Sequence, residues 1–500
     1  MEPDAVDQSA RKDEKAPTEA SPRGWGRADT LTVAILTGAL TLLGNMLVSA
    51  YNNHSNIVQE IQKAADDQRL EEKKGKYNLV LQAMQTNDPA FAKRNIDFFI
   101  DAGLLPDPDC KIRYAIDKDQ PVLPSLSGVA PATPAGMHSV PEIASLYNFP
   151  SGYDGRGVTI GILEFGGAIV RDDLEKYFKA MQLPVPEITS VSVDGAGPKP
   201  DRNADGQVMM DLEIIGALAP AAHIRIYFGA FEHGGYARAI ERATADGVAV
   251  LSTNWGAPEA QMSPDDVTQI NVALEKAVRQ RITVLAAAGD EGVTAGVDAH
   301  RHLIFPASSP WVLSVGGTSL KSENGKITSE TVWKTGGNLG TGGGFSEKFP
   351  RPDWQPDSLV PKGVDASSGR GIPDVVASAN PELGTPFLLH GQQIVIGGTG
   401  ESTDVWAGLI VRLDQALGYN IGHLTPRLYR DIGPVGLLHP ITSGDNGVGG
   451  VAGYSAGNGW TPVAGWGSPD GVKLLAWLRE HPDPQIGGRA AAQPCEVSAK

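Results

Sequence analysis

The feature that most constrains the fold is a regular alternation of two residue patterns between positions 158 and 315. Short apolar runs rich in β-branched residues predict buried strands at 158–165, 223–228, 248–255, 282–288 and 312–315. Between them, apolar residues recur at three- and four-residue steps, which predicts helices at 173–181, 208–218, 236–245 and 266–281. Such alternation favours an α/β fold, in which helices cover both faces of a doubly wound parallel sheet.

The stretch 394–408, IVIGGTGESTDVWAG, predicts a strand, a tight glycine turn and a helix. The first residues of such a helix lie over unpaired backbone N–H groups and the positive end of the helix dipole. In many hydrolases a nucleophilic serine stands there, because nearby N–H groups stabilise an oxyanion. The position after Gly397-Gly398-Thr399 is here Gly400, which has no side chain.

Three further positions are candidates for the same site. Ligands of parallel sheets bind at the carboxyl ends of the strands. Asp290 follows the predicted strand 282–288 at that edge, and we place the turn at Gly397 there as well. Gln207 and Asp211 are four residues apart, so they share one face of their predicted helix.

Several separate motifs between residues 141 and 478 resemble those of the sedolisin, or serine-carboxyl peptidase, family, which has a subtilisin-like fold. The motifs are MDLEIIGALAP (210–220), STNWGAPE (252–259), VLAAAGDEG (284–292), FPASSPWVLSVGGT (305–318), TGGGFSEKFPRPDWQ (341–355), GRGIPDVVASANP (369–381), VIGGTG (395–400) and GWGSPDG (465–471). Together they are specific for the family, although no single one would be.

The resemblance implies a catalytic set of four residues. In that family a Glu on the same helix as an Asp acts as general base to a Ser nucleophile, and a second Asp helps to stabilise the oxyanion. The helix Asp corresponds to Asp211 and the oxyanion Asp to Asp290. The Glu position holds Gln207 and the Ser position holds Gly400. Removing the nucleophile costs subtilisin roughly a millionfold in turnover. We therefore expect a pseudopeptidase whose cleft binds peptides or proteins without cleaving them.

Other interpretations remain open. An active serine-type endopeptidase would need another nucleophile, such as Ser402, which on a helix points about 200° away from position 400. Asp404 stands where this motif usually has Pro and should add negative charge, and Asn254 replaces a Ser. Both retained acids also have a structural interpretation, in which Asp211 is only a hydrogen-bonded helix residue and Asp290 only caps the turn after its strand. A scaffold whose N-terminal helices make the contacts is a third possibility.

The resemblance also implies a calcium site, built in the family from an Asp-Ile pair, two glycine-region carbonyls and a further Asp. The corresponding positions here are Pro440, Ile441, Gly457, Gly459 and Thr461. Calcium prefers several oxygen ligands, including carboxylates. Because both carboxylates are missing, we expect no calcium, and the sequence indicates no other cofactor.

Residues 30–51, TLTVAILTGALTLLGNMLVSAY, predict a transmembrane helix, because they are free of charge and about one bilayer span long. A cleaved signal peptide is the rival, since Val48-Ser49-Ala50 resembles a cleavage site. A buried core helix would need a polar face, which is missing. Basic residues are more frequent before the span than after it, so we expect an extracytoplasmic C-terminal domain. The formal net charge of -16 argues against a nucleic-acid partner.

These patterns divide the chain into six segments. They are a disordered segment 1–29, the transmembrane helix 30–51, a helical stalk 52–104, a Pro-rich linker 105–136, the sedolisin-like domain 137–480 and a disordered tail 481–500. The family resemblance implies a long inhibitory prodomain, for which residues 52–136 leave little room. A chain without peptidase activity needs no such inhibitor.

Overall fold

The structure is a computed structural model that describes residues 137–336, 338–361 and 368–483. The predicted segments 1–29, 30–51, 52–104 and 105–136, and most of 481–500, lie outside the described residues. Within the described part, no helix combines the length and the apolar character that crossing a membrane requires. The span predicted at 30–51 therefore stays a prediction.

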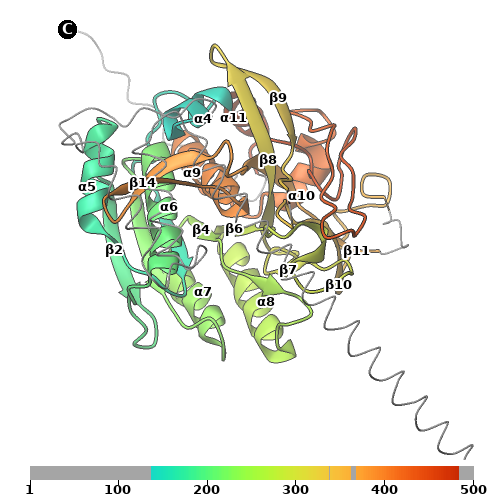
Figure 1. Cartoon of the computed structure of the whole chain (residues 1–500), viewed down its shortest axis with the longest axis horizontal. Helices are drawn as coiled ribbons and strands as arrows, with labels where there is room; N and C mark the ends of the chain where they lie inside the picture. Colours follow the sequence, from blue (N-terminus) through green and yellow to red (C-terminus); the bar gives the residue numbers. More distant parts are fainter. Residues whose placement is uncertain (1–136, 337, 362–367, 484–500) are drawn as a thin grey trace, which may run out of the picture. The chain divides into compact units, whose positions relative to one another are not determined.

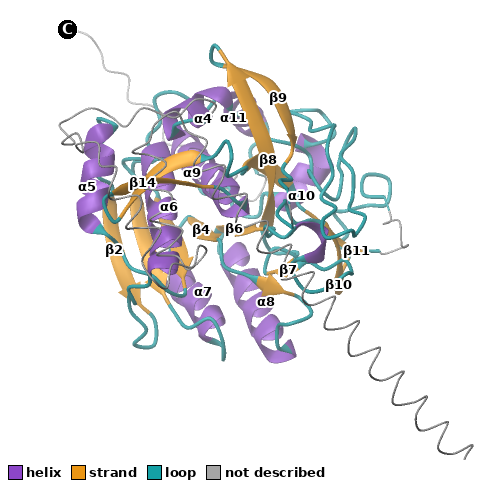
Figure 2. Ribbon diagram, in the orientation of Figure 1, coloured by secondary structure: helices purple, strands orange, loops and turns teal. Residues whose placement is uncertain are grey.

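The described residues are built around an eight-stranded sheet (Figures 1 and 2). Seven of its strands follow the order β12-β8-β6-β4-β1-β3-β2, and the eighth, β9, pairs with β8. All neighbours along that order are parallel, and β9 is antiparallel to β8. The strands are β1 (Thr159–Glu164), β2 (Glu187–Ser192), β3 (His223–Phe228), β4 (Val250–Thr253), β6 (Thr283–Ala287), β8 (Leu313–Glu323), β9 (Lys326–Val332) and β12 (Val375–Ser378). The predicted α/β fold with a parallel sheet is confirmed.

Helices cover both faces of this sheet (Figure 2). On one face α7 (Gly235–Ala245) packs against α8 (Pro264–Arg279), and on the other α6 (Arg202–Leu218) packs against α9 (Thr399–Leu417). The remaining helical elements are α4 (Val140–Leu146), α5 (Arg171–Ala180), η1 (Gly292–Thr294), α10 (Thr425–Arg427), η2 (Leu428–Ile432) and α11 (Gly471–Glu480).

Successive strand residues belong to different cores. Val250 of β4 packs with α6 and α9, whereas the next residue, Leu251, packs with α7 and α8. Side chains alternate between the two faces of a strand, so a strand that is covered on both faces needs apolar residues at every position. Burial on both faces explains why the sequences of these strands are continuous apolar runs and do not alternate between apolar and polar residues.

One predicted strand has an unexpected partner. The run at 394–396 belongs to β14 (Gln392–Ile396), which pairs antiparallel with β13 (Thr385–Leu389) outside the parallel sheet. A short apolar run indicates a buried strand without indicating which strand lies beside it. Two more two-stranded sheets join β5 (Ala257–Pro258) to β7 (Ile304–Phe305) and β10 (Gly344–Pro350) to β11 (Gly369–Ile372).

Candidate functional site

The packing of α6 on α9 brings the predicted site positions together. Gln207 and Asp211 lie on α6, and Gly400 is the second residue of α9. A Cβ atom built on Gly400 would lie 3.1 Å from Cε of Met210 and 3.3 Å from Cγ of Asn254. The position that the resemblance assigns to the nucleophile is therefore enclosed by α6 and by the residue that follows β4.

Gln207 and Asp211 share one helix face, as predicted. Nε2 of Gln207 donates to Oδ1 of Asp211 at 2.5 Å. Asn254 donates through Nδ2 to the same oxygen at 3.0 Å and to Oδ1 of Asp404 at 3.1 Å. The side chain at the general-base position is thus an amide whose N–H group points at a carboxyl group, and it has no basic atom.

Asp290 lies at the amino end of α9, close to Gly400. Its Oδ1 accepts hydrogen bonds from the backbone N–H of Thr399 at 2.8 Å and from Oγ1 of Thr399 at 2.9 Å. Gly398, with φ of 118°, permits this approach, because a Cβ there would lie 2.6 Å from Oδ2 of Asp290. Burial raises the pKa of Asp290, and the bonds from Thr399 oppose that shift. Asp290 therefore caps α9 from the position that the resemblance assigns to the oxyanion acid.

Three fully buried carboxyl groups lie next to one another beneath this site: Glu164, Asp211 and Asp404. Burial raises the pKa of all three, that of Asp211 to about 6, and repulsion by Asp211 raises those of Glu164 and Asp404 further. Neighbouring carboxyl groups in a buried site cannot all ionise. Burial and repulsion by Asp211 therefore disfavour the ionised form of Asp404, and the expectation that it adds negative charge stays a prediction.

Glu164 was not among the predicted site residues. It ends β1 and accepts a hydrogen bond from Nε1 of Trp255 at 2.7 Å, which fixes the indole beside the site. A glutamate at the carboxyl end of an otherwise apolar strand was the available signal, because a carboxyl group is rarely buried without a partner.

A cleft of about 660 Å³ opens beside these groups. It is lined by Phe165, Gly166, Gly167, Lys199, Pro200, Asp201, Ala204, Gln207, Asn254 and Trp255. None of the three buried carboxyl groups lines it, so the amides of Gln207 and Asn254 lie between the acids and the cleft. Amides can hydrogen-bond a peptide backbone but cannot exchange protons with a substrate at ordinary pH.

Ser402 does not face the cleft. Its side chain is fully buried, and its Oγ donates to the carbonyl oxygen of Gly316 in β8 at 2.6 Å. This position agrees with the helical geometry expected from the sequence. A hydroxyl group in this environment cannot reach a substrate carbonyl.

The positions assigned to calcium lie in the region between η2 and α11. Pro440 is exposed and Ile441 is buried. Thr461 accepts a hydrogen bond from the N–H of Ala464, and its methyl group lies 3.9 Å from where a Cβ of Gly457 would be. Gly459 has φ of 76°. Asp445 is held by Lys334 at 2.7 Å. In the part of the chain that the structure describes, no group of three or more His, Cys, Asp or Glu side chains is arranged to hold a metal ion.

Comparisons with known proteins point to one family of peptidases. The family model described as Subtilase family (peptidase S8) matches residues 206–432. Kumamolisin from Bacillus sp. (strain MN-32) is 43% identical over 348 residues, which are 67% of this chain and 63% of kumamolisin. Sedolisin from Pseudomonas sp. (strain 101) is 31% identical over 368 residues, 69% of this chain and 62% of sedolisin. The chain therefore spans less than two thirds of the length of these relatives.

A solved structure shows a similar fold. It is that of Pseudomonas sedolisin complexed with two molecules of pseudo-iodotyrostatin, and it matches with a TM-score of 0.63 and 29% sequence identity. The match covers 69% of this chain and 98% of the sedolisin chain.

The buried acids predict how stability depends on pH. Glu401, fully buried in the first turn of α9, accepts a hydrogen bond from Oγ1 of Thr385, and burial raises its pKa to about 8. The folded chain thus holds this proton more tightly than the unfolded chain does. The contribution of Glu401 to stability is complete below the unfolded pKa, near 4.3, and falls by up to about 1.4 kcal/mol per pH unit toward pH 8.

We therefore expect Glu401→Gln to raise the free energy of unfolding at pH 7 by at least about 1 kcal/mol and to change it little at pH 4. Chemical denaturation between pH 4 and 8 measures this difference. Glu241→Gln, at an exposed position of α7, is the matched control and should follow the wild type at each pH. A Glu401→Gln protein that is less stable than the wild type at pH 7 would contradict the assignment.

Proposed function

The chain belongs to the sedolisin family with its subtilisin-like fold, and we propose that it is a catalytically inactive member that binds peptides or protein segments in its cleft. The observation that carries this proposal is Gly400. It offers no nucleophile, and the space beside it is taken by Met210 and Asn254. The same chain also has an amide, Gln207, at the position of the general base.

Other hydroxyl groups near the site do not replace the missing serine. Oγ1 of Thr399 donates to Asp290 and accepts from the N–H of Gly289 at 3.0 Å. Ser402 is buried and donates to Gly316. A serine or threonine needs an adjacent base to become a strong nucleophile. The contacts of these two side chains support the inactive assignment over that of an active endopeptidase.

The cleft supports a binding role. A peptide backbone presents alternating N–H and C=O groups, and the amides of Gln207 and Asn254 offer a neutral surface for them. Phe165 and Trp255 supply apolar walls, and the exposed Lys199 lies at the rim. A site with apolar walls and a few convergent polar groups is typical of ligand pockets.

The catalytic proposal is tested by restoring the missing groups. Gly400 lies inside α9 without a positive φ, so a serine there causes no backbone strain. We expect Gly400→Ser and Gln207→Glu to be inactive singly and weakly active together at acid pH. Adding Asn254→Ser, the family residue, removes the side chain that crowds the new serine and should increase cleavage by about tenfold or more. Mass spectrometry of a mixed peptide library between pH 3 and 7 measures the products.

The wild type should give no cleavage in this assay and no labelling by a serine-directed fluorophosphonate probe. Wild-type cleavage that is abolished by Ser402→Ala would overturn the inactive assignment. An Asp211→Asn change in the triple variant serves as the control, because it should remove any restored activity.

The binding role is tested by asking what the purified full-length chain retains. We expect acid extraction followed by mass spectrometry to release peptides from the wild type. Ala204→Trp, which places a large ring in the cleft, should reduce their yield several-fold. Ala260→Trp, at an exposed position that does not line the cleft, is the control. Equal yields from all three proteins would contradict a peptide-binding cleft.

We also propose that residues 30–51 anchor the chain in a membrane, with the large domain on the outer side. The support is the charge-free apolar run and the excess of basic residues that precedes it. Protease added outside intact cells should then remove the domain and leave a short membrane-bound stub. Protection of the domain in right-side-out vesicles, with cleavage only after detergent treatment, would contradict this orientation.

A further inference from the structure

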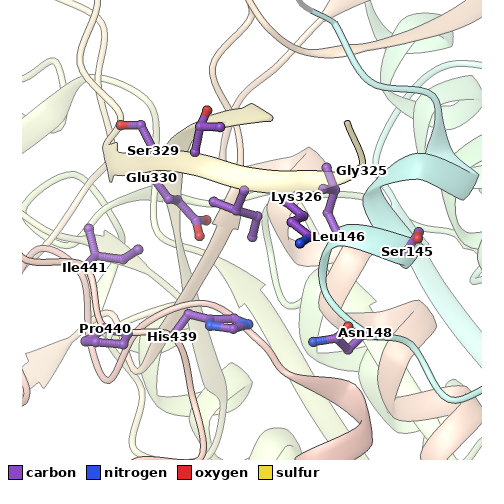
Figure 3. A pocket seen from close by; sticks show the side chains of 12 residues that line it. Ser145, Leu146, Asn148, Gly325, Lys326, Ser329, Glu330, His439, Pro440 and Ile441 are labelled. Carbon is purple, nitrogen blue, oxygen red and sulfur yellow. The ribbon is translucent and has the colours of Figure 1, made fainter. Parts of the chain in front are cut away.

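Two hollows of the described chain each have walls that one carboxyl group ties together. The first, of about 490 Å³, lies beside α4 and β9, and Figure 3 shows Glu330 in its wall. The oxygens of Glu330 accept from the hydroxyl groups of Tyr147 and Thr318, each at 2.7 Å, and from Ser468 at 2.6 Å. The second hollow is the cleft, which shares no lining residue with the first. One wall of the cleft is tied by Asp205, which does not itself line it.

That wall of the cleft is formed by two chain segments in close contact, one that follows β1 and one that leads into α6. The N–H group of Lys199 in the second segment donates to the carbonyl oxygen of Gly167 in the first at 2.9 Å. A Cβ built on Gly166 would lie 3.2 Å from Cβ of Ala204, and one built on Gly167 would lie 2.5 Å from the carbonyl oxygen of Ala204. The two segments therefore touch through backbone atoms, and few hydrogen bonds set their separation.

Asp205 supplies two of those hydrogen bonds from one atom. Its Oδ1 accepts from the backbone N–H of Ala168, in the segment after β1, at 2.7 Å and from the backbone N–H of Asp201, in the segment before α6, at 3.1 Å. Asp205 is only 2% exposed. Because hydrogen bonds are electrostatically stronger away from water, this oxygen holds the two segments at a fixed distance.

The other oxygen of Asp205 faces the hairpin formed by β13 and β14. Oδ2 lies 3.1 Å from Nε2 of His390, a partly exposed residue at the turn of that hairpin. The next residue, Gly391, donates its N–H to Oδ2 of Asp173 on α5 at 2.8 Å. Asp173 is as deeply buried as Asp205, but its partners in the described chain are Gly391 and Lys176, and it does not line the cleft. Of these two acids that hold the hairpin turn, Asp205 is the one that also bonds the cleft wall.

We propose that Asp205 is a positioning residue for the cleft: it fixes the wall through Oδ1 and ties that wall to the hairpin through His390. It acts without lining the cleft, because the backbone that it holds forms the surface a ligand meets. The effect on bound peptides rests on the proposed function of the cleft. The effect on the position of the wall does not, so the two can be measured separately.

The position of the wall is read at Trp255 in the full-length chain. A Cβ built on Gly166 would lie 3.9 Å from Cη2 of Trp255, and 6-fluorotryptophan places its fluorine on that atom. The protein has nine tryptophans, so its ¹⁹F spectrum has few resonances, and Trp255→Phe assigns the one of interest. We expect Asp205→Ala to shift this resonance by more than its linewidth. Asp205→Asn should restore it, because an amide oxygen can still accept from both N–H groups.

Two further variants make the test specific. His390→Ala, at a partly exposed position, removes the partner of Oδ2 and should give a smaller shift in the same direction, even if Asp205→Ala does not fold. Asp173→Ala is the matched control, because it removes an equally buried acid from the same hairpin turn. It leaves both bonds to the wall in place, so it should not move the Trp255 resonance.

Acid extraction of the same proteins measures the effect on binding. The yield of retained peptides should fall several-fold in Asp205→Ala and stay at the wild-type level in Asp205→Asn and Asp173→Ala. A wild type that retains no peptide contradicts the proposed function, while the ¹⁹F shifts still decide the role of Asp205. That role is overturned if neither Asp205→Ala nor His390→Ala moves the Trp255 resonance, if Asp173→Ala moves it as far as Asp205→Ala, or if Asp205→Asn fails to restore it.

Discussion

The close packing of α6 against α9 is the constraint on which the rest of the site depends. Gly408 permits it, since a Cβ at that position would lie 2.6 Å from Cβ of Leu218. The two helices cover the same face of the sheet, and their contact sets the positions of Gln207 and Asp211 opposite Gly400. A bulkier residue at 408 would separate the helices and disperse the site without touching any of its polar groups.

The substitutions around Gly400 form a mutually consistent set. Asn254 donates to both Asp211 and Asp404, and its side chain takes up space beside the missing serine. Its donors give the buried acids partners, which lowers the free-energy cost of burying their polar oxygens. The amides of Gln207 and Asn254 therefore lie between the buried acids and the cleft. This is why restoring two residues alone should recover little activity.

The sequence allowed much of the fold and part of the site to be predicted. Apolar periodicity located β1, β3, β4 and β6 and the helices beside them, because strands buried on both faces require continuous apolar runs. The four-residue spacing of Gln207 and Asp211 also predicted that they share one helix face, on which the structure shows a hydrogen bond between them. The antiparallel partner of β14 could not be predicted, since strand pairing depends on chain segments that are distant in sequence.

The sequence by itself determined the α/β architecture and the identity of the groups at the site, including the absence of a side chain at Gly400. Only the tertiary structure decided how deeply those groups are buried, in which direction their pKa values shift and how much space surrounds them. Asp404 is an acid like any other in the sequence, whereas burial beside Asp211 and Glu164 raises its pKa and so disfavours its ionised form. Desolvation and crowding arise when separate segments meet, so the chemical identity of one residue cannot encode them.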